Sequence, residues 1–355
     1  MIHIKAPARV CLFGDHQDYL GLPIIACAID RHITLNAHPN EASELCIRFL
    51  DIDQKRQIPV PYLFHNYHPE DTLLAALKVL QRYNCAPDKG YDITISGNIP
   101  INAGLSSSSA LVICWVAFLL KAFGGPLQYN QEFIAKIAYE AEVVEQNSPG
   151  GKMDQYSIAL GNIIYLETTG NNAYRTFPHK LPGLVIGESG IPKNTLGLLA
   201  EKRQMALEAL EFLKQDAILF DVRKVDAASI SSYLDALPRK LRPYFNAAVG
   251  NYLVTQKALL EMEKNELDLP TIGKLMTEHH TFLERDLKIT VPKIDAMIRA
   301  ALQYGAYGAK IVGSGGGGCM VALVPQGKEN AIIEHLKNLG ATDAYTVAVS
   351  NGITL

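Results

Sequence analysis

The chain has 355 residues, of which 48% are hydrophobic and 19% charged, and its formal net charge is -3. This composition excludes disorder as the dominant state, and at roughly 150 residues per domain the length suggests two domains. The near-neutral charge argues against nucleic acid or an anionic membrane as the main partner, because such partners require a basic face.

Apolar runs punctuated by glycine and proline predict strands in the first forty residues, at 2–5, 10–13, 24–29 and 32–37. The spacing of leucine and alanine then predicts a helix over 71–83, and alternation predicts a strand over 91–96. A buried helix is expected from residue 105 onward and a second one over 131–146. Short strands are expected at 163–166 and 184–187.

The second half is mostly helical, with helices predicted at 196–215, 227–237, 239–264, 271–287, 292–304 and 328–338. Strands are predicted at 309–312, 320–323 and 344–349. Helices and strands do not alternate regularly, as they would in a doubly wound sheet, so an α+β fold is predicted in both halves. We place the domain boundary at about residue 180, giving domains 1–180 and 181–355.

Neither the apolar runs nor the cysteines point to a membrane or secreted protein. The longest apolar run, 110–120, is shorter than the roughly 18 residues of a membrane span, and the N-terminus lacks signal-peptide features. The six cysteines form no C-x-x-C pair and mostly lie in apolar runs, which predicts buried thiols in a reducing cytoplasm. A cytoplasmic protein is therefore expected.

The most distinctive local feature is a run of four serines, 106–109, that follows Gly104 and opens an apolar helix. Helix N-termini present unpaired N–H groups and the positive end of the helix dipole. Small residues let an anion approach the backbone, and hydroxyls add donors. The segment predicts a phosphate-binding loop, and ordinary capping by serine is the alternative.

A second glycine-rich segment, Gly313 to Gly318, matches G-x-G-x-x-G, and no Walker A motif is present. A helix should follow the glycines of a dinucleotide-binding site, whereas residues 319–323 predict a strand. The order of strand, glycines and strand predicts a hairpin-like loop. Four consecutive glycines indicate a close backbone approach to another group, and a flexible turn is the alternative.

Polar side chains crowd the turn after the strand that begins at Arg9, where Asp15, His16 and Asp18 occur together. Their spacing matches no standard zinc motif. Carboxylates and a histidine on a turn suit a polyhydroxylated substrate, because carboxylates accept hydrogen bonds from hydroxyl groups. A solvated turn is the alternative.

Two further acids flank a Pro-Gly-Gly loop. Glu142 lies on an expected helix, and Asp154 stands at the end of the loop. Asp154 is a candidate general base or orienter of a hydroxyl nucleophile. Glu142 is a candidate ligand of Mg²⁺, which takes one or two carboxylates together with phosphates. Taken alone, each acid is more often a surface residue.

Together these segments resemble the GHMP small-molecule kinases, with the three family motifs in the family's order at 5–16, 104–108 and 310–319. The resemblance implies an α+β two-domain fold, with an N-terminal domain like ribosomal protein S5 and a ferredoxin-like C-terminal domain. It also implies that ATP is bound by Gly104, Leu105, Ser106, Ser107, Ser108, Ser109, Gly315 and Gly316.

Within the family, the sequence most resembles the galactokinase branch. The branch's G-E-H-x-D-Y segment matches residues 14–19, and its G-I-M-D-Q segment matches residues 151–155. The chain departs from the branch where Cys11 replaces an asparagine and Asp15 replaces a sugar-holding glutamate. The shorter acid retracts by roughly an ångström, so the sugar is open among galactose, arabinose, a uronic acid, an amino sugar and a heptose derivative.

The resemblance implies an ATP-dependent sugar kinase that phosphorylates the anomeric (C1) hydroxyl of a monosaccharide. The implied catalytic residues are Arg9 and Asp154, and the implied sugar-binding residues are Asp15, His16, Asp18 and Gly151. Ser108 and Glu142 are the implied ligands of Mg²⁺. Positioning and electrostatics carry such a transfer, with little covalent chemistry for the protein.

ATP and Mg²⁺ are the expected cofactors, and a sugar is the expected substrate of a monomer or homodimer that binds neither nucleic acid nor membrane. Three other functions stay open at this point. One is a mevalonate-type isoprenoid kinase, and another is a catalytically silent sensor of sugar and ATP. A nicotinamide-dependent oxidoreductase is the third, and only the glycine run favours it.

Overall fold

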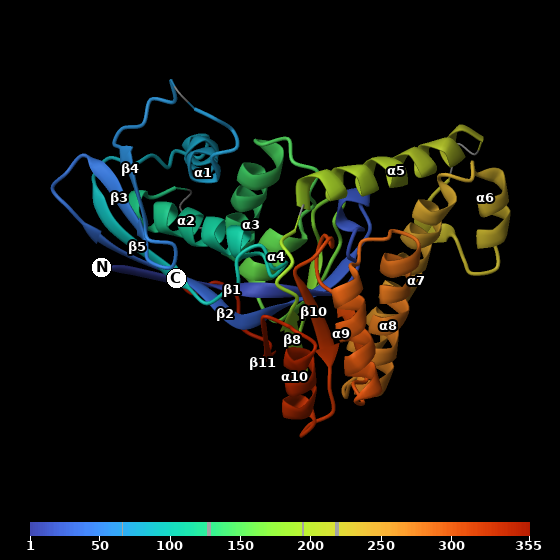
Figure 1. Cartoon of the computed structure of the whole chain (residues 1–355). Helices are drawn as coiled ribbons and strands as arrows, with labels where there is room; N and C mark the ends of the chain where they lie inside the picture. Colours follow the sequence, from blue (N-terminus) through green and yellow to red (C-terminus); the bar gives the residue numbers. More distant parts are fainter. Residues whose placement is uncertain (66, 126–128, 194, 217–219) are drawn as a thin grey trace.

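The computed structural model describes the chain except for residues 66, 126–128, 194 and 217–219. Its strands form two sheets (Figure 1). The first has seven strands in the order β4-β3-β5-β2-β6-β7, with β1 paired to β2, and the second has four in the order β11-β8-β10-β9. Mixed sheets with packed helices confirm the predicted α+β class.

Two long antiparallel strands, β1 (Ile2–Phe13) and β2 (Ile24–Pro39), form the centre of the first sheet. The sequence predicts four shorter strands over the same residues, and the structure joins them in pairs. The register shifts between Pro7 and Ala8. Proline has no N–H to donate, so the ladder is irregular there and the strand continues past it.

Three strands of this sheet are not predicted by the sequence. These are β3 (Glu44–Phe49), β4 (Gln54–Pro59) and β7 (Tyr174–Phe177). β4 and β7 lie at the two ends of the strand order and are mostly exposed. Their polar residues hide the alternation that marks a half-buried strand. β3 pairs in parallel with β5 (Tyr91–Gly97), a contact that local sequence does not specify.

Two helices, α2 (Ser107–Phe123) and α4 (Met153–Leu160), pack on the first sheet, and two more, α1 (Thr72–Gln81) and α3 (Gln131–Tyr139), pack on these helices (Figure 1). α2 is apolar on nearly every side and is buried along most of its length. The helix predicted over 131–146 is α3 continued by a π-helical segment, Glu140–Val144. The sequence predicts a loop up to Asp154, which is wrong, because α4 begins at Met153 and carries Asp154 in its first turn.

After β6 (Ile163–Leu166) and β7 the chain enters the second sheet. Its strands are β8 (Leu184–Glu188), β9 (Gly308–Ile311), β10 (Cys319–Leu323) and β11 (Asp343–Val347). β9 and β10 pair antiparallel around the glycine run, which confirms the predicted hairpin. The six helices predicted in this half are α5 (Thr195–Asp216), α6 (Ile230–Ala236), α7 (Arg242–Met262), α8 (Leu269–Arg285), α9 (Pro292–Gln303) and α10 (Glu329–Asn338).

The strands divide between the two sheets on either side of residue 180, and we keep 1–180 and 181–355 as proposed domains. The two halves are joined closely. The C-terminal tail returns to the first sheet, where Thr354 bridges Lys5 and Val349 bridges Ile29. One hydrophobic core includes residues of both halves, so the groups that meet between the sheets are held by a shared core.

All six cysteines are free thiols, and all except Cys46 are buried. None of the helices that the structure describes has the length and apolar character to span a membrane.

Candidate active site

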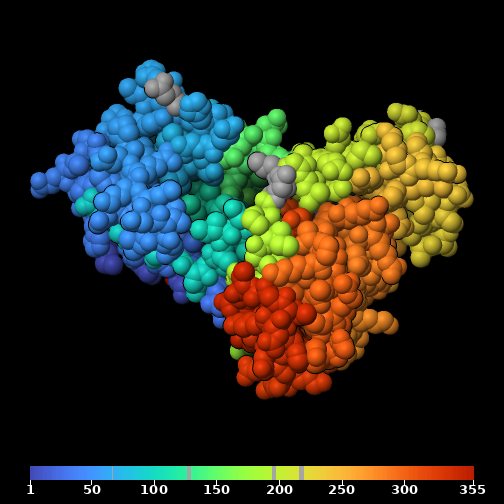
Figure 2. Space-filling view, viewed as in Figure 1, coloured from blue at the N-terminus to red at the C-terminus, as the bar shows by residue number. Residues whose placement is uncertain are grey.

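A cleft of about 590 Å³ opens between segments of the two halves. In Figure 2 the N-terminal part, blue to green, and the C-terminal part, yellow to red, lie side by side as two lobes. The turn after β1, the start of α2 and the start of the glycine loop all reach the cleft. The predicted site residues that line it are Arg9, Asp15, His16, Asp18, Gly104, Ser106, Ser107, Ser108, Ser109, Glu142, Gly151 and Asp154.

Asp154 is held by two residues from other elements. Arg9 donates from Nε and Nη2 to Asp154 Oδ1, both at 2.7 Å, and Ser106 Oγ donates to Asp154 Oδ2 at 2.7 Å. The Arg9 side chain is 4% exposed and the Asp154 side chain 31% exposed. Arg9 also donates from Nη1 to Gly104 O at 2.5 Å. The carboxylate is therefore fixed from the protein side and keeps an edge open to the cleft.

The start of α2 has an unusual cap. Ser106 precedes the helix with a φ of 61°, and its side chain makes no capping hydrogen bond because the hydroxyl donates to Asp154. The first backbone amide to bond within the helix is that of Ala110, which donates to Ser106 O at 3.0 Å. The amides of Ser107 to Ser109 thus have no intrahelical acceptor. A helix start of this kind, facing a cleft, binds phosphate well.

Glu142 projects from the π-helical segment toward the same helix start. Ser109 Oγ donates to Glu142 Oε1 at 3.1 Å, and Gln155 Nε2 donates to Oε2 at 2.6 Å. Burial, assisted by the charge of Asp154, raises the pKa of Glu142 to about 7. Ser109 is the serine that contacts Glu142, whereas Ser108 is exposed and lines the cleft. Oxygen donors and a carboxylate that lacks a cationic partner fit a divalent cation.

In the described part of the chain, no three His, Cys, Asp or Glu side chains are grouped so as to hold a metal ion. A cation beside Glu142 would therefore need oxygens from a bound phosphate as well. This is how Mg²⁺ is usually held in kinases.

We expect wild-type protein without ligands to lose stability, relative to a Glu142→Gln variant, as the pH rises from 5 to 8. The pKa of Glu142 rises from an ordinary value of 4.5 to about 7 on folding. The folded state therefore binds more protons than the unfolded chain in this range, so the stabilisation present at low pH disappears as pH rises through 7.

Urea unfolding of both proteins at several pH values measures this difference. The comparison with Glu142→Gln is needed because other buried groups also make stability depend on pH. Burial lowers the pKa of His279 to about 3 and that of His280 to about 4, so these two histidines make stability rise with pH, opposite to the effect of Glu142. A difference that does not change with pH would contradict the prediction.

The carboxylate of Asp18 also lines the cleft. It accepts hydrogen bonds from Met153 N at 3.2 Å and from Tyr19 N at 3.0 Å, and burial raises its pKa to about 6. A Cβ atom at Gly151 would lie 2.1 Å from this carboxylate. The absence of a side chain at Gly151 is therefore what admits Asp18 to its position.

His16 connects the β1 turn to the glycine loop. Its Nδ1 lies 2.9 Å from Tyr19 Oη and its Nε2 lies 3.1 Å from Ser314 O. A carbonyl oxygen only accepts, so we assign the ring proton to Nε2, and Nδ1 accepts from the tyrosine hydroxyl. Burial lowers the pKa of His16 to about 4, so the ring is neutral near pH 7.

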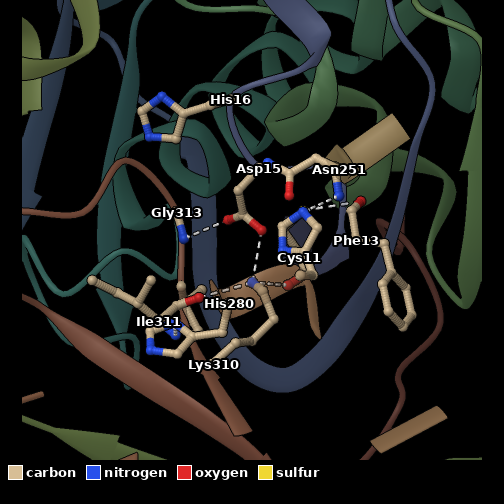
Figure 3. Close-up of polar contacts among 12 residues, drawn as sticks. Cys11, Phe13, Asp15, His16, Asn251, His280, Lys310, Ile311 and Gly313 are labelled. Atoms are coloured by element: carbon tan, nitrogen blue, oxygen red, sulfur yellow. Dashed lines mark hydrogen bonds and ion pairs between the residues drawn. The ribbon is translucent and has the colours of Figure 1, made fainter. Parts of the chain in front are cut away.

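Asp15 has partners other than the predicted ring hydroxyl (Figure 3). Its Oδ2 accepts from Lys310 Nζ at 2.6 Å, its Oδ1 accepts from Gly313 N at 2.9 Å, and the residue is 1% exposed. Burial opposes its charge, but Lys310 outweighs burial and lowers the pKa to about 2. Lys310 Nζ also donates to Cys11 O at 2.9 Å and Ile311 O at 2.8 Å. Asp15 thus ties the β1 turn to the glycine loop.

Three predicted ATP-binding residues do not line the cleft. Leu105 is fully buried in the core. Gly316 N donates to Ile289 O at 2.7 Å, and a Cβ at Gly315 would lie 2.4 Å from the same oxygen. These two glycines are therefore used to pack the loop against the segment before α9, and Gly313 and Ser314 reach the cleft instead.

The cleft also contains a lysine that the sequence does not single out. Lys193, between β8 and α5, donates from Nζ to Val312 O at 3.0 Å. Burial, together with the nearby charge of Arg9, lowers its pKa to about 8. No local motif in the sequence marks this lysine.

Models of known protein families match segments in both halves of the chain. Residues 71–162 match the model for the GHMP kinases N terminal domain, and residues 256–342 match that for the GHMP kinases C terminal. Residues 2–39 match the galactokinase galactose-binding signature. Together the first two models account for about half of the chain.

Among curated proteins, the chain is 28% identical to a galactokinase of Thermococcus kodakarensis over 343 residues, covering 93% of this chain and 91% of that protein. It is 27% identical to a mevalonate kinase of Thermococcus sibiricus over 360 residues, covering 99% of this chain and 97% of that protein. Sequence identity alone thus does not separate these two kinds of kinase.

Solved structures share the fold over nearly the whole chain. Lactococcus lactis galactokinase, solved with galactose, matches with a TM-score of 0.88 at 22% identity, covering 99% of this chain and 94% of that one. Methanococcus jannaschii mevalonate kinase matches with a TM-score of 0.72 at 23% identity, covering 99% and 98%. Both domain models, the relatives and the fold show that this chain belongs to the GHMP kinases, a family of ATP-dependent small-molecule kinases.

Proposed function

We propose that this enzyme transfers the γ-phosphoryl group of ATP to the anomeric hydroxyl of a monosaccharide. The observation that carries the proposal is the position of Asp154, held by Arg9 and Ser106 with one edge open to the cleft. The serine-rich start of α2 and Asp18 line the same cleft as Asp154. The match of residues 2–39 to a galactose-binding signature favours a sugar at the Asp18 end.

The nucleotide's phosphates are proposed to lie at the start of α2. The amides and hydroxyls of Ser107 and Ser108 supply donors there, and Lys193 and Arg9 supply positive charge. Glu142, with Ser108 or Ser109, would hold Mg²⁺, which neutralises phosphate charge during transfer.

The acceptor sugar is proposed to lie between Asp18 and Asp154, with His16 at its edge. Asp18 accepts hydrogen bonds from ring hydroxyls, and Asp154 accepts the proton of the attacking hydroxyl or orients it. Arg9 stabilises the charge that develops between the sugar oxygen and the phosphoryl group. Since both carboxylate oxygens of Asp15 already accept hydrogen bonds from the protein, we propose that Asp15 fixes the turn and that Asp18 is the main carboxylate for the sugar.

The test is to incubate the pure protein with Mg-ATP and a panel of free monosaccharides, with mevalonate as a separate arm. The panel contains galactose, arabinose, uronic acids, amino sugars and heptoses. We expect ADP release with one sugar class and a product whose NMR spectrum shows phosphate on C1. Mass spectrometry should show the addition of one phosphoryl group.

The other outcomes point to other functions. Turnover with mevalonate and none with sugars would favour the second candidate, for which the 27% identity to mevalonate kinases over 99% of the chain is the supporting observation. Binding of ATP and sugar without turnover would indicate a silent sensor.

A further inference from the structure

The cleft continues past the serine-rich helix start into an apolar end that the transfer chemistry does not use. Its floor is formed by adjacent strands, where Phe49 of β3 pairs with Ile95 of β5, and Ile33 of β2 pairs with Gly97. Leu111, one turn into α2, lies on the wall. An apolar slot next to a phosphate site suits the faces of a flat heterocyclic base.

One carboxylate lies at this end. Asp51 belongs to the turn between β3 and β4, which closes over the end of β5, and Leu50 N donates to Ile95 O at 2.9 Å. Asp51 is exposed and lines the cleft. Its Oδ2 accepts from Gly97 N at 2.6 Å, whereas its Oδ1 has no hydrogen bond with the described residues. The backbone amide therefore fixes the carboxylate and leaves one oxygen for a ligand.

The other acids that line the cleft belong to the reacting end. They are Asp15, Asp18, Glu142 and Asp154. Asp51 can therefore form a hydrogen bond with a polar group at the edge of a base, and it takes no part in the proposed phosphoryl transfer.

We propose that Asp51 selects the base of the nucleotide, its free oxygen accepting a hydrogen bond from the exocyclic amine of adenine. The inference rests on the proposed nucleotide site and adds base specificity to it. An ionised carboxylate is an acceptor only. The 6-oxo group of hypoxanthine is also an acceptor, so it cannot donate a hydrogen bond to Asp51. An inosine nucleotide would therefore leave the free oxygen of Asp51 without a donor and should bind more weakly than ATP.

The same geometry predicts that Asp51→Asn changes the preference of the protein for ATP over ITP. The N–H of Gly97 requires an acceptor, so the asparagine keeps its oxygen there and directs its NH₂ group to the base. The group facing the base then changes from acceptor to donor. Affinity for ATP should fall by about tenfold, and affinity for ITP should rise, as expected for one charge-assisted hydrogen bond.

The test measures dissociation constants of Mg-ATP, Mg-ITP and purine riboside triphosphate, which lacks the amine, by titration calorimetry without sugar. Wild-type protein should favour ATP over both by about tenfold or more. Asp51→Asn should lower the ATP-to-ITP affinity ratio by at least about tenfold. The ratio within one variant does not depend on how much of the sample is folded.

Asp53→Asn is the matched control, because it removes the same charge from the same turn at a position that does not line the cleft. It should keep the wild-type ratio. An unchanged ratio in Asp51→Asn, or an equal change in Asp53→Asn, would overturn the base assignment alone. Absence of nucleotide binding by the wild type would overturn the proposed function as well.

Discussion

Replacing Asp154 with asparagine is expected to lower kcat by about a hundredfold or more, as for loss of a group that handles the reacting proton. Asparagine has nearly the same shape and retains an oxygen for Arg9, so the cleft should keep its form. What is lost is the negative charge that faces the acceptor hydroxyl. Steady-state ADP release gives kcat, and calorimetry should show a nucleotide dissociation constant close to that of the wild type.

Ser106→Ala is the control for this prediction. It removes the hydrogen bond to Asp154 Oδ2 and keeps the carboxylate, so it should cost about 1 kcal/mol, or several-fold in rate. A large loss in Asp154→Asn beside a small loss in Ser106→Ala separates charge from positioning. An unchanged kcat in Asp154→Asn would contradict the catalytic assignment, and equal losses in both variants would point to positioning alone.

The sequence predicts those elements of the cleft that are marked by the composition and spacing of neighbouring residues. The strand at 91–96 and the apolar helix after the serines are visible in composition and spacing, and the structure contains both. The helix that carries Asp154 was not predicted. Its eight residues begin one residue after a Pro-Gly-Gly segment, and so short a helix is stabilised by packing more than by its own sequence.

Contacts between distant segments were the part that the sequence did not predict. Asp15 and Lys310 are 295 positions apart, and their pairing depends on the tertiary fold, which brings the Lys310 side chain of β9 to the end of β1 and the turn after it. Lys193 reaches the cleft from the loop after β8 and has no local motif. The match to the family motif suggests only that Asp15 faces the sugar. It does not reveal the partner Lys310, because that lysine is distant in the sequence.

The Asp15–Lys310 pair leads to the second large expected effect, because both side chains are almost fully buried, at 1% and 0% exposure. Lys310→Met keeps the length of the side chain and leaves Asp15 as an unpaired charge in the interior. Removing one partner of a buried pair costs about 3–5 kcal/mol. We therefore expect the free energy of unfolding, measured with urea at pH 7, to fall by about that amount.

Two further proteins make this result specific. In the double variant Asp15→Asn with Lys310→Met the uncompensated charge is absent, so its stability should exceed that of Lys310→Met alone. Lys240→Met is the surface control, since Lys240 is 63% exposed and pairs with Glu208 at 2.7 Å, and it should change stability by about 1 kcal/mol or less.

Substitutions of Lys310 are also expected to affect function, because the Asp15–Lys310 pair holds the turn after β1 against the glycine loop. Lys310→Arg keeps the charge, so it should recover much of the stability, while a planar guanidinium cannot reproduce the three donors that Lys310 directs to Asp15, Cys11 and Ile311. Its KM for the acceptor should therefore rise more than its kcat falls. Equal stability of Lys310→Met and the wild type would show that the buried charge is compensated elsewhere, and the coupling of the two loops through Lys310 would then be wrong.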